Sequence, residues 1–293
     1  MVNLPKVALK SKLFTAKLLG NVIKNSLTFK IKRSAMRRFK STDFDTVIVD
    51  MDGTIYKSDA NLEGLCVFYP SVVEGEVEGV KIYSALVDKI ASGQYSVEQA
   101  IVEGNEYFIK KGMSKTDFKK VYEHIQPGLR KKLVKALKNL KADGKTLVLA
   151  TLSSKDFGDY LNKQLKKDFD FEFDFVVGTQ LSFDEIGKVN GISSIVGMKD
   201  GDLNGVKVKS KLTAIKDAFQ EAGKEFTLNK SVLITDSYSD IDLGKMIVTI
   251  LIKPRKSTKA QKVSQSLKLA DYILYDDVYL KTNLESILLG PEK

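Results

Sequence analysis

Three short apolar runs that each lead into an oxygen-bearing side chain constrain the fold of this chain more than any other feature. They are residues 45–50 (D-T-V-I-V-D), 146–151 (T-L-V-L-A-T) and 231–236 (S-V-L-I-T-D). Continuous runs rich in Val, Ile and Leu are typical of strands that are buried on both faces, as in a parallel sheet. Residues 247–252 form a fourth run of the same type. The sequence therefore predicts a parallel sheet with both faces covered.

Helix-forming segments lie between these runs and provide the cover. The spacing predicts helices over residues 130–141, 157–167 and 211–222. Strands that alternate with helices are typical of an α/β fold, because parallel strands need a crossover connection. We therefore predict a doubly wound parallel sheet of the Rossmann-like kind.

One connection is too long for a simple crossover. About ninety residues, mostly polar and helix-forming, separate the first two runs. We predict an inserted helical domain over 61–141 and a core formed by 43–60 and 142–293. Within the core, residues 171–208 alternate and are rich in Gly and Asp turns, which predicts a β-hairpin excursion.

The positive charge of the chain is confined to its start. The formal net charge is +10, from 47 Lys and Arg against 37 Asp and Glu. Residues 1–42 contain eleven of the basic residues and none of the acidic ones, so the remainder is close to neutral. A basic stripe across a whole domain would have indicated nucleic-acid binding, whereas this distribution does not. We expect no nucleic-acid partner.

The basic arm, residues 1–42, has three interpretations that the sequence leaves open. Its apolar residues share one helical face beside regularly spaced lysines, a pattern typical of helices that lie on anionic lipid. Docking on the body of the protein and a targeting role fit the same composition. No run reaches the roughly 18 apolar residues that a membrane-spanning helix needs. The expected location is cytoplasmic, with peripheral membrane contact through the arm as one alternative.

Two scarce residue types exclude several catalytic sites. Cys66 is the only cysteine, which excludes an intramolecular disulfide and a cysteine-rich zinc site. His124 is the only histidine, which excludes the two-histidine zinc motifs. It lies in a charge-rich helical stretch, where a surface position is expected.

The ends of the three best strands predict an oxygen-lined site. Asp50, Thr151 and Asp236 each close one run. Ligands of open parallel sheets bind at the carboxyl ends of the strands, so these side chains are expected to meet there. Two carboxylates and a hydroxyl suit Mg²⁺, which uses few protein carboxylates and keeps other positions for water or phosphate.

The first strand continues as Asp50-Met51-Asp52-Gly53-Thr54, and this segment offers covalent chemistry. Asp50 and Asp52 alternate along an extended stretch, so both can face the same side. An aspartate can attack a phosphate when a metal neutralises the approaching charge. A second acid can then protonate the leaving alcohol and activate water. Gly53 permits a tight turn that exposes backbone N–H groups to a phosphate.

These residues resemble the haloacid dehalogenase-like superfamily of phosphohydrolases. D-M-D-G-T resembles its first motif, and three further segments follow in the family's order: L-V-L-A-T with Thr151, K-S-K-L-T-A-I with Lys211, and I-T-D-S-Y-S-D with Asp236 and Asp240. The resemblance covers residues 45 to about 277. The position of the long insert and the segment 176–191 are similar to the branch that contains phosphoserine phosphatases and lipid-phosphate phosphatases.

The resemblance implies a role for each motif residue. Catalytic roles fall to Asp50, Asp52, Thr151 and Lys211, with Lys209 as the alternative lysine. Metal contacts fall to Asp50, to the backbone carbonyl of Asp52, and to Asp236, with Asp240 supporting them. We expect substrate contacts from Gly53, Thr54, Asp59 and Ser153.

Two departures from the pattern bear on the substrate. Phosphoserine phosphatases have a glutamate nine residues beyond the nucleophile, where this chain has Asp59. They also have an arginine for the substrate carboxylate, and Gly104 falls at that position here. A missing guanidinium removes the bidentate carboxylate contact, which argues against phosphoserine.

The resulting prediction is a Mg²⁺-dependent phosphomonoesterase that acts through an aspartyl-phosphate. Its substrate is a small-metabolite or lipid-precursor phosphate. The alternatives are a phosphotransferase or mutase that uses the same aspartate, and a non-catalytic phosphate-binding scaffold. The intact Asp50 and Asp52 pair counts against the scaffold.

Overall fold

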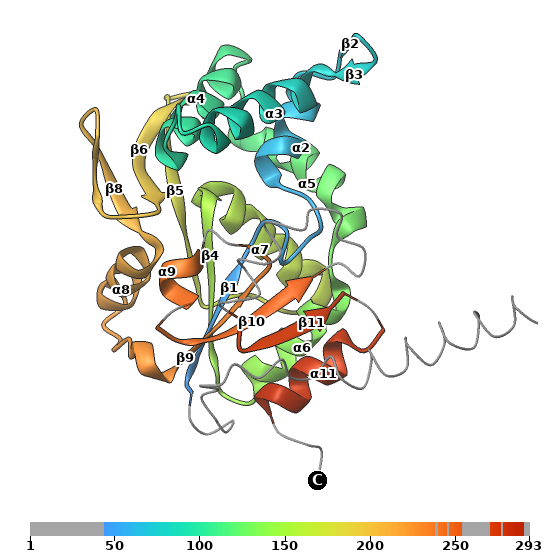
Figure 1. Cartoon of the computed structure of the whole chain (residues 1–293), viewed down its shortest axis with the longest axis vertical. Coiled ribbons are helices and arrows are strands. Elements are labelled where there is room, and N and C mark those ends of the chain that lie inside the picture. Colours follow the sequence, from blue (N-terminus) through green and yellow to red (C-terminus); the bar gives the residue numbers. More distant parts are fainter. Residues whose placement is uncertain (1–43, 238–239, 245, 254–269, 277, 290–293) are drawn as a thin grey trace, which may run out of the picture.

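A computed structural model describes residues 44–237, 240–244, 246–253, 270–276 and 278–289. Within these residues, nine strands form one sheet in the order β11-β10-β9-β1-β4-β5-β6-β8-β7 (Figure 1). The basic arm lies outside the described residues, and so do the interpretations that concern it. None of the described helices is long and apolar enough to cross a membrane.

The parallel part of the sheet contains the four predicted strands. β1 (Thr46–Asp50) lies between β4 (Thr146–Ser154) and β9 (Ser231–Thr235), and β9 pairs with β10 (Val248–Lys253). The outer parallel strands are β5 (Phe175–Phe183), next to β4, and β11 (Tyr272–Tyr275), next to β10. All of these pairs are parallel, as the buried apolar runs predict.

The region predicted as a β-hairpin excursion does contain an antiparallel hairpin, but the hairpin belongs to the main sheet, which corrects the second part of that expectation. β6 (Val189–Gly197) pairs antiparallel with β5, and β8 (Val206–Ser210) pairs parallel with β6. A short β7 (Gly201–Leu203) closes the edge against β8. The alternating pattern of residues 171–208 indicates strands but does not say with which strands they pair. The sheet is therefore mixed at this edge and parallel elsewhere.

Helices cover both faces of the sheet, as the doubly wound fold requires. Val47 and Val49 of β1 belong to one apolar cluster, which includes residues of α6 (Lys131–Ala142), α7 (Lys155–Phe169) and α11 (Leu280–Leu288). Ile48 points to the opposite face, where the second cluster includes residues of α8 (Lys211–Glu221) and α9 (Ile241–Gly244). The alternation along β1 thus gives one sheet two cores. The predicted α/β fold class is confirmed.

Serine caps explain where two of the predicted helices begin. Ser154 Oγ accepts a hydrogen bond from the N–H of Phe157, so α7 starts two residues before its predicted start. Ser210 Oγ accepts from the N–H of Thr213 in the same way and fixes the start of α8 at Lys211. Such caps satisfy backbone donors that have no partner inside the helix.

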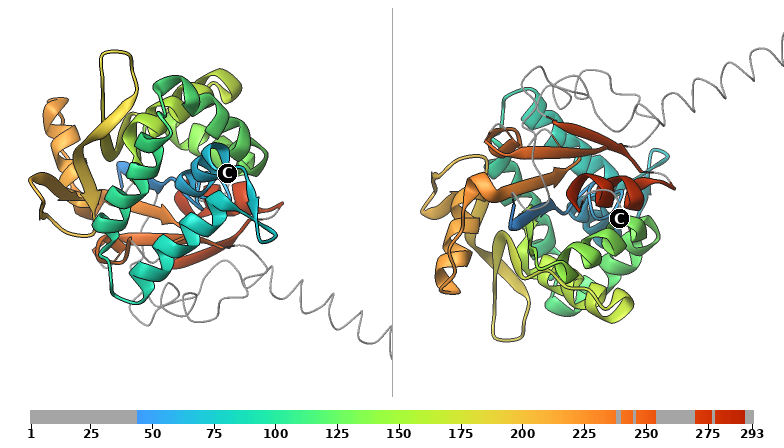
Figure 2. Two further views of the ribbon diagram at one scale, coloured as in Figure 1. Left: turned by 90° about the horizontal axis from the view of Figure 1, so that it is seen from above. Right: turned by 90° about the horizontal axis from the view of Figure 1, so that it is seen from below.

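Four helices lie between β1 and the remainder of the core. They are α2 (Ala60–Phe68), α3 (Glu78–Ala91), α4 (Val97–Lys110) and α5 (Phe118–Ile125), with a small hairpin of β2 (Val72–Val73) and β3 (Glu76–Val77). Figure 2 (left) looks down on these helices and shows them over one end of the sheet. The following helix, α6, packs against α11 and β4 instead. We therefore propose that the inserted domain predicted over 61–141 ends before α6.

The insert is attached to the core by contacts other than its two connections. The N–H of Val189 in β6 donates to the carbonyl of Met113 at 2.8 Å, and Met198 N–H donates to Glu98 Oε1 of α4 at 2.7 Å. On the other side, Phe118 of α5 packs edge to face on Phe157 of α7. These contacts hold the insert on β6 and α7 at the same time.

The crossing of α2 and α3 gives a stability test. A Cβ atom at Gly79 would lie 2.4 Å from the backbone carbon of Leu65, whereas one at Gly104 of α4 would meet only Leu86, at 3.6 Å. We expect Gly79→Ala to lower the free energy of unfolding by about 1–3 kcal/mol through overpacking. Gly104→Ala should leave it unchanged or raise it by about 0.5–1 kcal/mol. Denaturant unfolding of both variants checks this, and equal stabilities would contradict the close crossing.

Candidate active site

Two carboxylates meet where β1 and β9 end, that of Asp50 buried and that of Asp236 partly exposed. Asp50 is the last residue of β1, and Asp236 directly follows β9, its parallel neighbour. The hydroxyl of Thr54 lies between them, at 3.2 Å from Asp236 Oδ1 and 3.5 Å from Asp50 Oδ2. The same hydroxyl accepts from the Asp236 N–H at 3.0 Å. The pairing of the strands therefore brings together two of the acids that the sequence analysis singled out.

Gly53 is required by the turn between these two acids. Its φ is +70°, in the left-handed region that favours glycine. A Cβ atom at this position would lie 2.1 Å from Asp236 Oδ2. Any side chain would thus occupy the place of the second carboxylate, in addition to straining the backbone.

Lys211 is the lysine that reaches this site. It is the first residue of α8 and is buried, with Nζ 2.7 Å from Asp50 Oδ1 and 2.5 Å from Asp240 Oδ1. The other oxygen of Asp240 accepts from the hydroxyl of Thr235 at 2.6 Å. Lys209 points elsewhere and forms an ion pair with Asp217. The structure therefore places Lys211, and not Lys209, next to Asp50.

The site carries more negative charge than its cations balance. Burial raises the pKa of Asp50 well above its usual value despite the Lys211 ammonium, and the charges of Asp240 and Asp236 add to the rise. Burial likewise raises the pKa of Asp236 to about 6, although the Arg130 guanidinium opposes it. Burial alone would lower the pKa of Lys211, but the carboxylates of Asp240 and Asp50 raise it. The lysine is therefore firmly charged among acids in excess.

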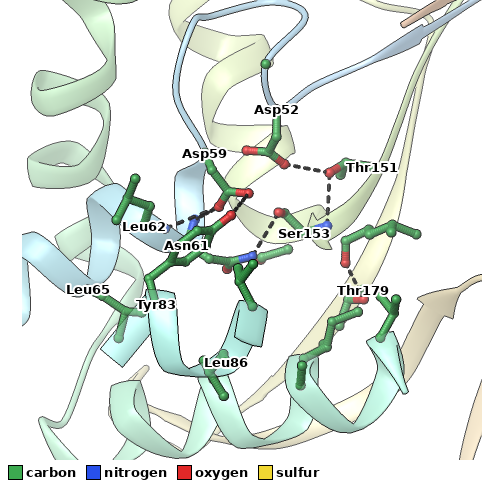
Figure 3. Close-up of a pocket in the computed structure, with 18 of the residues that line it drawn as sticks. Asp52, Asp59, Asn61, Leu62, Leu65, Tyr83, Leu86, Thr151, Ser153 and Thr179 are labelled. Carbon is green, nitrogen blue, oxygen red and sulfur yellow. Dashed lines mark hydrogen bonds between the residues drawn. The ribbon is translucent and has the colours of Figure 1, made fainter. Parts of the chain in front are cut away.

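Asp52 turns towards Thr151 at the mouth of the sheet. Asp52 Oδ2 accepts from the Thr151 hydroxyl at 3.1 Å, while Oδ1 accepts from the Tyr56 hydroxyl at 2.5 Å and from the Ala60 N–H at 2.7 Å. These bonds to Oδ1 hold the carboxylate at the start of α2 and leave Oδ2 facing Thr151. Figure 3 shows the two side chains pointing at each other.

The prediction that the second strand ends at Thr151 is wrong. β4 runs on to Ser154 through an irregularity in its pairing with β5 after Ala150. The irregularity turns the Thr151 hydroxyl so that it also accepts from the Ser153 N–H at 2.9 Å. Ser153 Oγ in turn accepts from Asn61 Nδ2 at 3.0 Å, which joins β4 to the insert.

Asp59 caps α2 from inside the site. Its Oδ1 accepts from the N–H groups of Asn61 at 2.8 Å and Leu62 at 3.2 Å, and its Oδ2 accepts from the Tyr83 hydroxyl at 2.9 Å. Burial, and then the charge of Asp52, raises the pKa of the Asp59 carboxyl to about 7. Asp59 therefore fixes α2 and α3 relative to the catalytic turn, besides lining the site.

Arg130 is a residue of the site that the sequence analysis missed. It is buried, and its Nη1 donates to the carbonyls of Gly53, Thr54 and Tyr56, the latter two at 3.0 Å. Its Nε lies 3.3 Å from Asp276 Oδ2. One guanidinium thus holds three carbonyls of the turn that carries Asp52. A lone arginine before a helix gives no sequence signal of this role.

A cavity of about 520 Å³ opens at these residues. Asp50, Asp52, Thr151 and Asp236 line it from the core, and side chains of α2, α3 and α4 line it from the insert. Figure 3 shows that Ser153 and Asn61 meet between the two parts of the wall. The predicted contact residues Gly53, Asp59 and Ser153 line the cavity, whereas Thr54 is fully buried behind Asp50 and Asp236.

The donor set fits a hard divalent cation. In the part of the chain that the structure describes, no three His, Cys, Asp or Glu side chains are grouped so that they could hold a metal by themselves. Mg²⁺ does not need such a group, because it binds through one or two carboxylates together with water and phosphate. Asp50 and Asp236 provide two carboxylates beside one shared hydroxyl, in a site with excess negative charge.

A family comparison agrees with this arrangement. The model of the haloacid dehalogenase-like hydrolases matches residues 47–245, which is more than half of the chain. The chain belongs to this family, and the prediction of a hydrolase of this kind is confirmed. The match spans Asp50, Thr151, Lys211 and Asp236. No protein in a search of curated sequences matches the chain.

Solved structures show the same fold at low sequence identity. A phosphoserine phosphohydrolase-like protein of Francisella tularensis is 16% identical, with a TM-score of 0.54 over 84% of this chain and 100% of that one. A substrate-bound phosphoserine phosphatase is 13% identical, with a TM-score of 0.51 over 81% and 94%. Cytosolic 5′-nucleotidase IIIB bound to cytidine is 14% identical, with a TM-score of 0.53 over 84% and 86%.

The raised pKa of Asp59 predicts how stability depends on pH. The folded carboxyl, with a pKa of about 7, binds its proton more tightly than the unfolded one, with a pKa near 3.8. Between about pH 4 and pH 7, unfolding therefore releases a proton from Asp59. The stabilisation that this proton provides is fully present at about pH 4 and is lost as the pH rises through 7. Asp59→Asn keeps an oxygen for the cap but has no such proton.

We expect the stability of the wild type relative to Asp59→Asn to fall by about 2–3 kcal/mol between pH 5 and pH 8. Denaturant unfolding at both pH values measures the difference. Asp50 and Asp236 titrate in both proteins, so the comparison isolates Asp59. A difference that is constant with pH would show that Asp59 is ionised throughout this range.

Proposed function

We propose that this protein is a Mg²⁺-dependent phosphomonoester hydrolase that uses Asp50 as its nucleophile. The observation that carries the proposal is the position of Asp50, buried at the end of β1, bonded to Lys211 and open to a cavity that Asp52 and Asp236 also line. Membership in the hydrolase family supports it. The solved phosphatase structures share the fold and are consistent with the same reaction class.

Three groups at the strand ends would hold the metal. They are the carboxylates of Asp50 and Asp236 and the backbone carbonyl of Asp52. A bound Mg²⁺ would supply positive charge for the phosphate oxygens and for these carboxylates. Asp240 supports these groups without being counted among the ligands. It accepts from Lys211 and Thr235 and thereby positions the lysine.

The first step is attack of Asp50 on phosphorus. Lys211 donates to Oδ1 of Asp50 at 2.7 Å, whereas Oδ2 has only the longer contact with the Thr54 hydroxyl at 3.5 Å, so we assign Oδ2 as the attacking oxygen. As the Oδ2–P bond forms, the bond from phosphorus to the ester oxygen breaks, and Asp52 gives its proton to the departing alkoxide. We assign that proton to Asp52 Oδ2, because Oδ1 is held by the Tyr56 hydroxyl and the Ala60 N–H.

The second step hydrolyses the aspartyl-phosphate. Asp52, now ionised, takes a proton from water, whose oxygen attacks phosphorus and displaces the Asp50 carboxylate as phosphate forms. The Lys211 ammonium and the Thr151 hydroxyl stabilise charge on the phosphoryl oxygens, whereas the N–H of Gly53 donates to the carbonyl of Ser58 at 2.8 Å. Each proton that leaves Asp52 is thus replaced in the same cycle.

A phosphotransferase would use the same first step and replace water by an alcohol. The Asp50 and Asp52 geometry serves both reactions, and we propose hydrolysis because the chain belongs to a family of hydrolases. We propose contact of residues 1–42 with an anionic membrane because of the positive charge of that segment, and a cytoplasmic location because the sequence has a single cysteine.

Removal of the nucleophile tests the mechanism. We expect Asp50→Asn to lower phosphate release by at least about 10³-fold, because the amide cannot form the covalent intermediate. Chelation of divalent cations should abolish release by the wild type, and added Mg²⁺ should restore it. Release is measured with a broad panel of phosphomonoesters. Turnover that survives Asp50→Asn would exclude Asp50 as the nucleophile.

The two neighbouring lysines provide a matched pair for the charge-stabilising role. We expect Lys211→Met to lower kcat by about 10²–10³-fold, because it removes the ammonium beside Asp50. Lys209→Met removes the same charge from a surface pair with Asp217 and should leave kcat within about twofold. Circular dichroism confirms that both variants fold. Equal losses in the two variants would contradict the placement of Lys211.

A further inference from the structure

The insert gives the cavity an apolar wall with helical spacing. On α3, the lining residues are Tyr83, Leu86, Val87 and Ile90, which recur every three or four residues and thus share one face. On α4, the lining positions run from Val97 to Phe108 with the same spacing, and Asn105 is the one polar residue among them, with its amide donating to the carbonyl of Ile101 at 2.8 Å. Two helices therefore turn their apolar faces towards the catalytic carboxylates and leave space between.

No charged side chain lies on this wall. None of the cavity residues that α2, α3 and α4 contribute is Asp, Glu, Lys or Arg. Among the described residues that line the cavity, Lys57 is the single cation, and it pairs with Asp276 at 3.1 Å with most of its side chain exposed. The wall therefore offers no ammonium or guanidinium that could bind a carboxylate or a second phosphate of a substrate.

Negative charge at the core end of the cavity also disfavours substrates with a second anionic group. Asp50, Asp52, Asp59 and Asp236 all line it at the core side. A substrate with a second anionic group would bring that group between these acids and an apolar wall, where its hydration would be lost without a compensating ion pair. An uncharged apolar group loses no such hydration and is favoured by burial.

We infer that the substrate is the phosphate monoester of an apolar alcohol, with an uncharged alkyl or aryl body that lies between α3 and α4. The inference rests on the proposed function, since it places the ester oxygen at Asp52. Ser153 and Asn61 mark the boundary, because they hydrogen-bond where the polar and apolar parts of the wall meet (Figure 3). The phosphate lies on the side of Asp52 and Thr151, and the body lies on the side of Leu86.

Gly104 provides room for that body. It lies on the lining face of α4, and a Cβ atom there would meet only Leu86, at 3.6 Å. A larger side chain at 104 would extend from α4 towards α3 and take up part of the apolar space. Gly104 is therefore a position at which the length of the accepted chain can be changed without touching a polar group of the site.

A series of n-alkyl monophosphates from methyl to dodecyl tests the inference on the full chain with Mg²⁺. We expect kcat/KM to rise about threefold to fourfold per methylene until the cavity is filled, and then to level off. Phosphoserine and a nucleoside diphosphate should be poorer substrates than an alkyl phosphate of similar length. A flat profile, or a preference for phosphoserine, would overturn the inference.

Two leucine variants on α4 locate the apolar body. Gly104→Leu should move the plateau to a shorter chain and lower kcat/KM for the longest esters by about tenfold or more. Glu106→Leu places the same side chain at an exposed position of α4 that does not line the cavity, and its profile should match that of the wild type. Identical profiles for the two variants would show that the body binds elsewhere.

Binding without turnover separates this inference from the proposed function. n-Alkylphosphonates cannot be hydrolysed, so calorimetric titration of the wild type and of Asp50→Asn with them needs no catalysis. An affinity that rises with chain length, in protein that releases no phosphate from any ester, would support the apolar site and reject the hydrolase mechanism. Turnover with no dependence of rate or affinity on chain length would support the hydrolase mechanism and reject the apolar site.

Discussion

The balance between buried acids and two buried cations controls the geometry of this protein at the end of the sheet. Asp50, Asp236 and Asp240 are largely withdrawn from water, and an unpaired charge in such a place is costly. Lys211 bonds two of these carboxylates, and Arg130 bonds the carbonyls of the turn that follows β1. Each cation joins segments that are distant in sequence, so the acids stay close despite their repulsion. The excess negative charge that remains is what a divalent cation would neutralise.

The turn that carries Asp52 also determines where the insert lies. Ala60 N–H, at the start of α2, donates to Asp52, while Asp59 caps the same helix and accepts from Tyr83 of α3. The insert is bonded again to β6 through Val189 and Glu98. Because it is held on both sides, the apolar wall has a defined position relative to the nucleophile. Selection among alcohols can then follow from the shape and polarity of the wall.

The sequence predicts the parts of the site that lie at the ends of strands with a continuous apolar run. Val47 to Asp50 reads as a buried strand because every residue but the last is apolar, and parallel pairing then brings its end to Asp236. It does not predict the extra length of β4, because a bulge depends on the neighbouring strand. Nor does it predict Arg130, whose partners are main-chain carbonyls that leave no trace in residue types. The pairing of residues 189–210 with the main sheet was missed because alternation indicates a strand without naming its neighbour.

The apolar wall is another feature that residue types alone do not predict. Leu86 and Phe108 are buried and spaced as core residues, so their pattern alone predicts helix packing and nothing more. Only the positions of α3 and α4 show that part of this apolar surface faces an open cavity instead of a neighbouring helix. An apolar cavity forgoes the dispersion contacts that a filled core would have, so it costs stability in the absence of a ligand. An apolar ligand that enters the cavity would restore these contacts. The apolar surface next to Asp50 is therefore more readily explained by ligand binding than by folding.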